Sequence, residues 1–474
     1  MLTLSVEMIV QLTGGELLVG PEETVANGLV IDSRDVVPGA IFVAFTGEQT
    51  DGHEHIRGAL DAGARAILVT RDDEGVRASF TEHGRAECAL VLIEDPRAAI
   101  EALASWHRDR LHIPVIGITG STGKTTTKDF VRSVLATRMR VVATSGNRNN
   151  ELGVPLTLME AGVSTEALVV EMAMRGVGQI AHLCTIARPT AGLVTNVGVS
   201  HMEVLGSQEA IASAKGELVA AVPAEGRVFI NGDDAYTVRM ADGASAAVTR
   251  YGLGPDAEIT AREIETSPSG APSFTLVVPE GSAHVTLPVP GRHNVYNALA
   301  AAAIGRYLLI SLEDIVCGLE SATFSRWRME TFVSASGVTV INDAYNANPT
   351  SMRAAIEALG DVPTTRRRIA VLGDMAELGS LTELAHFELG QVVARSSVDV
   401  LVAVGELGAR IADGARAAGL AEIAVRPCID AVEATEVLND LLEVGDTILV
   451  KASRVMELET VVEGMMDPRV QPAS

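Results

Sequence analysis

Residues 117–129 read GITGSTGKTTTKD, and this stretch decides the fold of the central part of the chain. It follows an apolar run typical of a buried strand and begins a predicted helix. Gly120 and Gly123 allow backbone N–H groups to close around phosphate oxygens. Lys124 adds a positive charge, and the hydroxyl of Thr125 at the helix N-terminus can bind Mg²⁺. The stretch therefore predicts a phosphate-binding loop that holds a nucleotide.

One position departs from the strict phosphate-loop pattern, because this chain has Ile118 where the pattern has glycine. A Gly/Thr-rich turn that only caps a helix is the alternative interpretation. The order of strand, loop and helix favours nucleotide binding over that alternative, although it does not by itself indicate a hydrolase.

Periodicity divides the chain into three α/β parts. Residues 1–112 mix short apolar runs with helical stretches and predict a small N-terminal domain. Over residues 113–325, buried strands alternate with helices, which is typical of a parallel sheet covered on both faces, with a Gly/Pro/Ser-rich strand region at 253–290. Residues 326–474 alternate strands and helices again. We therefore expect an α/β protein with a central P-loop domain and a C-terminal Rossmann-like domain.

Composition limits the possible partners. The 474 residues include 37 basic and 61 acidic side chains, which gives a formal net charge of −24. This charge would repel nucleic-acid phosphates and anionic membranes, so no nucleic acid is expected as a partner. The spacing of the four cysteines matches neither a zinc site nor a disulfide framework. Without a basic leader or a long apolar helix, we expect a cytoplasmic protein with no membrane insertion.

Two polar residues follow predicted strands near the phosphate loop. Glu171 is near the end of the apolar run ALVVEM, and His201 comes shortly after the run AGLVTNVG. Ligands of open parallel sheets bind at the carboxyl ends of strands, so both side chains are expected to face the phosphates and bind metal. Taken singly, Glu171 could be a solvated strand end and His201 a hydrogen-bonded loop histidine.

Lys215 occupies an unusual position in a chain with only four lysines. Its spacing from Ile211 and Leu218 places it on the apolar stripe of a predicted helix. Burial would lower the pKa of its amine, and a neutral amine can react with CO₂ to give a carbamate that binds a cation. Alternatively, the ammonium reaches the helix edge or pairs with Glu171 or Glu217.

Amide side chains recur beyond the central sheet. Asn294 and Asn297 share one face of a predicted helix, where their amides suit the donors and acceptors of adenine, although Asn294 could equally cap the helix. The stretches INDAYNANPTSM at 341–352 and KASRVME at 451–457 are polar strand ends, which turn chemistry alone could also explain.

Together these segments resemble the Mur ligase family over all three predicted domains. The similar stretches are IDSRDVVPGAIFVAFTGEQTDGH (31–53), GITGSTGKTTTKD (117–129), GNRNNELGVPLTL (146–158), TNVGVSHMEVLGSQEAIASAKGEL (195–218), GRHNVYNALAA (291–301), RMETF (328–332), NDAYNANPTSM (342–352), VLGDMAELG (371–379) and KASRVMELE (451–459). Such a set is far more specific than a single phosphate loop.

The resemblance also implies roles for individual residues. It assigns Lys124, Glu171, His201 and a carbamylated Lys215 to catalysis, and Thr125, Glu171, His201 and Lys215 to Mg²⁺, with two ions expected. ATP would be held by Gly120, Ser121, Thr122, Gly123, Lys124, Thr125, Thr126, Asn294, Asn297, Arg328 and Asp343. The UDP end of the substrate would be held in the N-terminal domain by Ser33, Arg34, Gly47, Asp51, Gly52 and His53. Further substrate contacts, chiefly to the incoming dipeptide, would come from Asn150, Tyr345, Asn346, Asn348, Lys451, Ser453 and Arg454.

The activity that the resemblance implies is ATP-dependent amide formation. D-alanyl-D-alanine would be joined to a UDP-N-acetylmuramoyl-tripeptide in peptidoglycan precursor synthesis, by a monomer. A carboxylate is a poor electrophile, so transfer of the γ-phosphoryl group of ATP would first give an acyl phosphate. The amine of the dipeptide would then displace phosphate.

Three other functions compete with this interpretation. A ligase that adds a diamino acid at the third peptide position carries an acidic-Asn-Pro-Arg motif, which we do not find, whereas YNANP at 345–349 favours the dipeptide. Folylpolyglutamate synthase lacks the UDP-binding domain that DSR at 32–34 suggests. A nucleotide-dependent regulatory or scaffold protein would not need the metal-binding residues.

Overall fold

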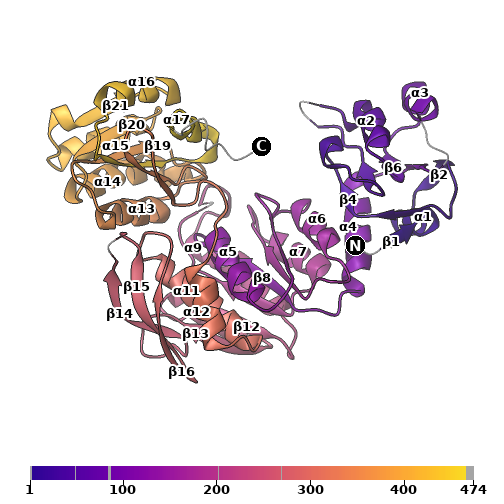
Figure 1. Cartoon of the computed structure of the whole chain (residues 1–474), viewed down its shortest axis with the longest axis horizontal. Coiled ribbons are helices and arrows are strands. Elements are labelled where there is room, and N and C mark those ends of the chain that lie inside the picture. Colours follow the sequence, from indigo (N-terminus) through magenta and orange to yellow (C-terminus); the bar gives the residue numbers. More distant parts are fainter. Residues whose placement is uncertain (1–2, 48–49, 84–86, 201, 268, 466–474) are drawn as a thin grey trace. The chain divides into compact units, whose positions relative to one another are not determined.

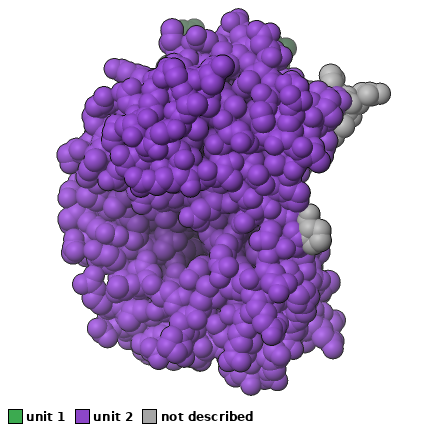
Figure 2. Space-filling view, turned by 90° about the vertical axis from the view of Figure 1, so that its left-hand side faces the viewer, with its two compact units in different colours: residues 1–117, 139–173, 179–191 green, residues 118–138, 174–178, 192–474 purple. Residues whose placement is uncertain are grey.

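The structure is a computed structural model that describes residues 3–47, 50–83, 87–200, 202–267 and 269–465. Its contacts divide the chain into two compact units, the first of residues 1–117, 139–173 and 179–191 and the second of residues 118–138, 174–178 and 192–474. Figure 2 colours these units and shows a hollow in the face of the second unit that it presents. Helices alternate along the chain with strands, most of which belong to largely parallel sheets. This confirms the predicted α/β class.

The N-terminal part holds a five-stranded sheet in the order β2-β7-β6-β5-β4. Its four strands from β4 to β7 are parallel, and β2 pairs antiparallel at the edge. A separate antiparallel pair joins β1 to β3. The strands are β1 (Thr3–Ser5), β2 (Glu16–Val19), β3 (Val25–Asn27), β4 (Leu29–Val30), β5 (Ile41–Val43), β6 (Ala66–Val69) and β7 (Ala89–Leu92). The helices are α1 (Val6–Thr13), α2 (Ile56–Asp61), α3 (Glu74–His83) and α4 (Pro96–Asp109).

The central sheet has the order β13-β12-β11-β8-β10-β9. Its strands are β8 (Val115–Thr119), β9 (Val141–Ala143), β10 (Ala167–Glu171), β11 (Ala191–Val194), β12 (Arg227–Asn231) and β13 (Ala247–Tyr251). The surrounding helices are α5 (Lys124–Ala136), α6 (Gly153–Glu160), α7 (Gln179–Ala187), α8 (Met202–Leu205), α9 (Gln208–Ala221) and α10 (Ala235–Met240). Strands β8, β10 and β11 are buried along their whole length, which explains their continuous apolar sequence.

The Gly/Pro/Ser-rich region forms the predicted strands. They make a three-stranded antiparallel sheet of β14 (Thr260–Thr266), β15 (Pro272–Val278) and β16 (Gly281–Thr286). Helices α11 (Asn294–Tyr307) and α12 (Leu312–Glu320) follow and lie beside this sheet (Figure 1). Most of α11 is buried, because alanines and large apolar residues occur on all its faces.

The C-terminal sheet has the order β17-β18-β22-β19-β20-β21. Strand β17 pairs antiparallel at one edge, and the other five are parallel. Its strands are β17 (Glu330–Val333), β18 (Thr339–Asn342), β19 (Arg368–Gly373), β20 (Val400–Val404), β21 (Val425–Cys428) and β22 (Thr447–Lys451). Its helices are α13 (Pro349–Asp361), α14 (Thr382–Arg395), α15 (Gly408–Ala417), α16 (Ala431–Leu441) and α17 (Glu459–Glu463). Asn348 and Ser351 form a capping box that begins α13 directly after the polar strand end.

The sequence predicts neither a membrane-spanning segment nor a disulfide framework. Over the described ranges, no helix combines the length and apolarity that a bilayer crossing requires. All four cysteines are free thiols, and Cys317 is the exposed one.

Candidate active site

The phosphate loop lies between the end of β8 and the start of α5, as predicted. Gly120 and Gly123 have φ angles of 149° and 77°. A Cβ atom at Gly120 would lie 1.8 Å from the hydroxyl of Thr195, and one at Gly123 would lie 2.6 Å from Oδ1 of Asn297. The backbone and the neighbouring side chains therefore both require glycine. Ile118 is buried inside β8, so this departure from the strict pattern leaves the loop itself unchanged.

The loop is held by a residue that sequence reasoning missed. Asn196 Oδ1 accepts hydrogen bonds from the backbone N–H and the hydroxyl of Thr122, both at 3.1 Å, and Asn196 O accepts from Ser121 N at 3.0 Å. Lys124 Nζ donates to Gly120 O at 2.7 Å. Asn196 follows β11, so its position at a strand end was the available signal.

A cavity of about 290 Å³ in the second unit adjoins this loop. It brings together most of the residues predicted for ATP and some predicted for the dipeptide, namely Ser121, Thr122, Gly123, Lys124, Thr125, Thr126, Asn297, Arg328, Asp343, Asn346, Asn348 and Lys451. Residues that were not predicted also line it, including Asn196, Asn231, His293 and Tyr296. Segments from 121 to 451 thus converge on one polar cavity of a size that suits a small ligand.

The two asparagines of α11 have different positions. Asn297 lines the cavity, and its Oδ1 accepts a hydrogen bond from Thr127 Oγ1 at 3.0 Å. Asn294 Oδ1 accepts from Asn297 Nδ2 at 2.9 Å, while Asn294 Nδ2 donates to Pro290 O at 2.7 Å. The helix begins at Asn294, and its N-cap residue is His293, so the interpretation of Asn294 as an N-cap is wrong. Asn294 instead orients Asn297.

Lys451 and Asp343 form a buried ion pair at the cavity wall. Lys451 Nζ lies 2.6 Å from Asp343 Oδ2 and donates to Asn346 O at 2.7 Å. Burial lowers the pKa of Lys451, and the carboxylate of Asp343 opposes that shift. The ammonium of Lys451 is therefore committed to protein acceptors.

His293 lies close to this ion pair. Burial lowers the pKa of its imidazole to about 4, although the nearby charge of Asp343 favours protonation. At neutral pH the cavity wall therefore carries a neutral imidazole. The sequence signal was its place in GRHN, directly before Asn294.

Lys215 lies where the apolar stripe predicted it, in the buried face of α9 with 2% of its surface exposed. Burial lowers the pKa of its amine well below the usual range, and the positive charge of Lys124 lowers it further. In the part of the chain that the structure describes, no hydrogen bond or ion pair reaches Lys215 Nζ. Glu217, one suggested partner, accepts a hydrogen bond from Gly178 N at 2.6 Å. Burial therefore favours the neutral form of this amine.

Glu171, in the first unit, ends β10 and is almost completely buried. Its Oε1 accepts a hydrogen bond from Asn149 Nδ2 at 2.8 Å, whereas its Oε2 is buried without a hydrogen-bond partner. A buried carboxylate oxygen without a donor fits a position that binds a cation. His201 lies outside the described residues, and no cluster of three His, Cys, Asp or Glu side chains suited to a metal occurs within them.

The residues predicted for the UDP end follow strands of the N-terminal sheet. Ser33 and Arg34 belong to a 3₁₀ turn, η1 (Ser33–Asp35), after β4, and Asp32 accepts hydrogen bonds from Arg34 N and Nε, both at 2.9 Å. Asp51 lies beyond β5. Its Oδ1 accepts from His53 N at 3.0 Å and lies 2.6 Å from His53 Nδ1.

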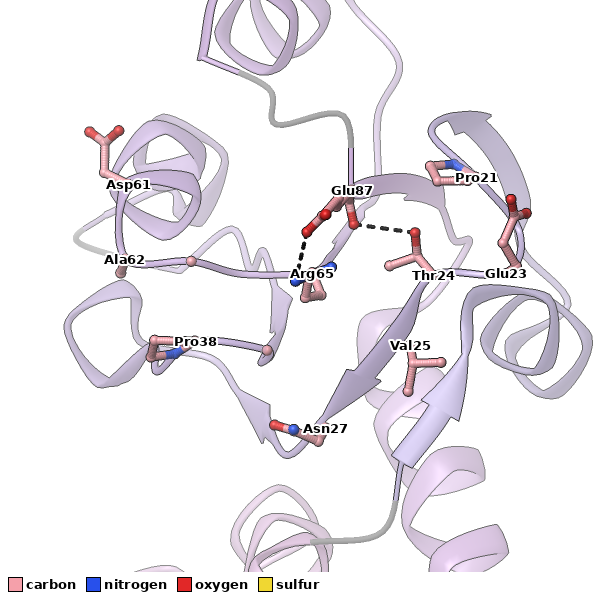
Figure 3. Close-up of a pocket in the computed structure, with 12 residues that line it drawn as sticks. Pro21, Glu23, Thr24, Val25, Asn27, Pro38, Asp61, Ala62, Arg65 and Glu87 are labelled. Carbon is pink, nitrogen blue, oxygen red and sulfur yellow. Dashed lines mark hydrogen bonds and ion pairs between the residues drawn. The ribbon is translucent and has the colours of Figure 1, made fainter.

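A larger cavity of about 850 Å³ lies elsewhere in the N-terminal part (Figure 3). Glu87 connects two of its walls, with an ion pair to Arg65 at 2.7 Å and a hydrogen bond from Thr24 Oγ1 to its carbonyl at 3.2 Å. None of the residues predicted for UDP lines this cavity.

The remaining predicted substrate residues make protein contacts outside the nucleotide cavity. Asn150 Oδ1 accepts from Gly153 N at 2.9 Å at the start of α6, and Ser453 Oγ accepts from Ala376 N at 2.9 Å. Arg454 pairs with Glu459, and its guanidinium lies 4.5 Å from the ring centroid of Trp327.

Comparison with known proteins finds one family over most of the chain. Three family models cover the chain in order: "Mur ligase family, catalytic domain" over residues 25–108, "Mur ligase middle domain" over 118–305, and "Mur ligase, glutamate ligase domain" over 327–454. A UDP-N-acetylmuramoyl-tripeptide–D-alanyl-D-alanine ligase of Bacillus subtilis is 37% identical over 446 residues, 94% of each chain.

Solved structures agree with these matches. MurF from Acinetobacter baumannii is similar with a TM-score of 0.84 and 31% identity, over 98% of this chain and 99% of that one. MurF ligase from Thermotoga maritima, solved in complex with ADP, has a TM-score of 0.75 and 26% identity, over 92% and 96%. This chain belongs to the Mur ligase family.

Proposed function

We propose that the protein is an ATP-dependent ligase that joins D-alanyl-D-alanine to a UDP-N-acetylmuramoyl-tripeptide, giving the UDP-linked pentapeptide of peptidoglycan synthesis, ADP and phosphate. Sequence similarity over nearly the whole chain to relatives whose names state this activity supports the assignment of these substrates. The observation that carries the proposal is the polar cavity in which the phosphate loop meets Asn297, Arg328 and Asp343. A regulatory binding protein would not need the desolvated amine of Lys215.

The chemistry follows from the charges beside the loop. A carboxylate resists attack by an amine, so the γ-phosphoryl group of ATP moves to the substrate carboxylate first. Lys124 and Arg328 stabilise the negative charge that spreads over the transferring group. The dipeptide amine then attacks the acyl phosphate, and phosphate leaves from the tetrahedral intermediate. Water must be kept from the acyl phosphate during these steps.

We keep Mg²⁺ as a proposed cofactor, with the ligands that the sequence suggested. Thr125 offers a hydroxyl at the phosphate loop, Glu171 has a carboxylate oxygen without a donor, and His201 is a further proposed ligand. When bound, the metal would neutralise part of the phosphate charge.

We assign the remaining ligand to Lys215 as a carbamate. The neutral Nζ would attack the carbon of CO₂, and the amine would lose one proton, leaving an anionic carbamate with two oxygen donors. The supporting observations are its burial, its lowered pKa and its lack of a described partner. An ammonium at this position would repel a metal, whereas a carbamate offers the oxygen ligands that Mg²⁺ prefers.

The other site residues and the domain boundaries stay proposals. The UDP end is assigned to the loops after β4 and β5, and the dipeptide to the segment that includes Asn346 and Asn348, beside the nucleotide cavity. We keep the division into domains at residues 112 and 325, which agrees with the gaps between the three matched family models.

Release of phosphate from ATP tests the function. We expect release with a UDP-muramoyl-tripeptide and D-alanyl-D-alanine together, and none with a UDP-muramoyl-dipeptide and a free diamino acid. The opposite pattern would assign the chain to the diamino-acid ligases. Phosphate release without any acceptor would indicate an ATPase instead.

A further inference from the structure

The segment Trp327–Met329 has an unusual backbone. Trp327 and Met329 have φ angles of 61° and 52°, in the left-handed region that bulky side chains rarely adopt. Two hydrogen bonds hold this conformation: Tyr345 N donates to Trp327 O at 3.3 Å, and Met329 N donates to Asp343 Oδ1 at 3.1 Å. The backbone on both sides of Arg328 is therefore fixed against residues 343–345.

The side chain of Arg328 extends from this fixed backbone towards the phosphate loop. One terminal nitrogen donates to Thr125 Oγ1 at 3.1 Å, and Nε is buried without a hydrogen-bond partner. The guanidinium carbon lies 3.9 Å from the ring centroid of Tyr345. At that distance the guanidinium contacts the face of the ring, where the negative side of the aromatic quadrupole attracts a cation.

Tyr345 and Arg328 differ in their relation to the cavity. Arg328 lines it, together with the loop residues, whereas Tyr345 does not. The ring therefore backs the guanidinium from outside the cavity. Because Nε is unpaired, the ring contact and the single hydrogen bond to Thr125 are the described contacts that restrict the guanidinium plane.

We infer that Tyr345 is a positioning residue for Arg328: its ring holds the guanidinium in the orientation that meets the phosphates of the nucleotide, and it does not bind the dipeptide. The inference rests on the proposed ATP site and goes beyond it by assigning a role to a side chain outside the cavity. The contact with the guanidinium uses the aromatic face of Tyr345 and not its phenol hydroxyl. Loss of the ring frees the guanidinium to rotate, and the cost appears in nucleotide binding.

Equilibrium binding of ADP and ATP to the full chain tests this role, because it does not depend on turnover. Tyr345→Leu is expected to weaken nucleotide binding by about 3- to 30-fold, the range of a partly buried cation–π contact. Tyr345→Phe keeps the ring and should stay within about twofold of the wild type. Tyr345→Met, which fills the same space without a ring, serves as a second variant if Tyr345→Leu melts at a lower temperature.

A double-mutant cycle isolates the pair. In an Arg328→Met background, where no cation remains over the ring, Tyr345→Leu should cause no further loss of affinity. Tyr236→Leu is the matched control: it also removes a ring beneath an arginine, with Arg239 4.5 Å from the centroid, but on α10 away from the nucleotide cavity. This control should bind ADP as the wild type does.

Steady-state kinetics distinguish positioning of Arg328 by Tyr345 from binding of the dipeptide by Tyr345. With ATP saturating, the KM for D-alanyl-D-alanine should be unchanged in Tyr345→Leu, while the KM for ATP rises. Unchanged nucleotide affinity in both the Leu and Met variants, or a rise confined to the dipeptide KM, would overturn the inference. A wild-type protein that binds neither ADP nor ATP would overturn the proposed function and this inference with it.

Discussion

Lys451 Nζ lies 2.6 Å from Asp343 Oδ2, in a pair that joins the end of β22 to the residue after β18. Both side chains are largely buried, and the same ammonium also donates to Asn346 O. Strands β18 and β22 are neighbours in the sheet, so the pair connects two adjacent carboxyl ends. These contacts fix the loop that supplies Asp343 and Asn346 to the cavity.

Removal of one partner of this pair is expected to destabilise the folded protein. Lys451→Met would leave the carboxylate of Asp343 without its cation and should lower the free energy of unfolding by about 3 to 5 kcal/mol, as measured by urea denaturation. The double variant Lys451→Met/Asp343→Asn removes both charges and should recover part of that loss. Equal stabilities of the single variant and the wild type would contradict a structural role for the pair.

His293 should make stability depend on pH. Its pKa is lowered from 6.5 to about 4 in the folded state, so between these values the unfolded state binds more protons. The stability that the protein gains from a neutral His293 is therefore fully present above about pH 6.5. It is lost as the pH falls towards about 4, which lowers the free energy of unfolding by up to about 3 kcal/mol.

The free energy of unfolding is measured across this pH range for the wild type and for His293→Gln. The difference between the two gives the contribution of His293. His284→Gln, at an exposed position on β16, is the control and should keep the wild-type profile. A parallel dependence in wild type and His293→Gln would exclude His293 as its source.

Arg34 should contribute to binding of the UDP end of the substrate. Its side chain is 86% exposed and pairs with Asp32, so it packs against little. Arg34→Ala is expected to raise the KM for the UDP substrate several-fold and to leave the KM for ATP unchanged, because it removes uniform binding. Arg77→Ala, which breaks an exposed pair with Asp72 in the same part, should change neither value. Equal rises in both KM values would point to misfolding.

The sequence predicted those parts of the fold that long apolar runs specify. Strands β8, β10 and β11 were located from such runs. Strands β17 and β21 were missed for physical reasons: both are short edge strands, and β21 contains Pro427, which cannot donate to a ladder and reads as a turn.

Site residues could be predicted from the sequence where a single helix or strand determines their position. The buried position of Lys215 follows from helical spacing alone. The contact between Arg328 and Thr125 does not, because it joins residues 203 positions apart, and periodicity contains no information on which loops converge. The same limit explains why Asn196 was missed and why Asn294 was open to interpretation as a cap.

Lys215 offers the sharpest test of the proposed metal chemistry. Lys215→Ala should lose most activity and regain part of it in concentrated formate, because a small carboxylate can occupy the position of the lost carbamate. Lys128→Ala is a matched control, since Lys128 is also buried but pairs with Asp129 at 2.8 Å. Any activity lost in that variant should not return with formate.

A measurement on the intact protein separates modification from activity. With ¹³C-labelled bicarbonate, the wild type should show a carbamate carbonyl resonance that Lys215→Ala lacks and Lys128→Ala retains. The resonance should weaken as the pH falls, because loss of CO₂ from a carbamate consumes a proton. An unmodified amine in bicarbonate, together with near-normal activity of Lys215→Ala, would reject the carbamate. A desolvated lysine would then be a feature of the α9 core, and Mg²⁺ would need a different ligand.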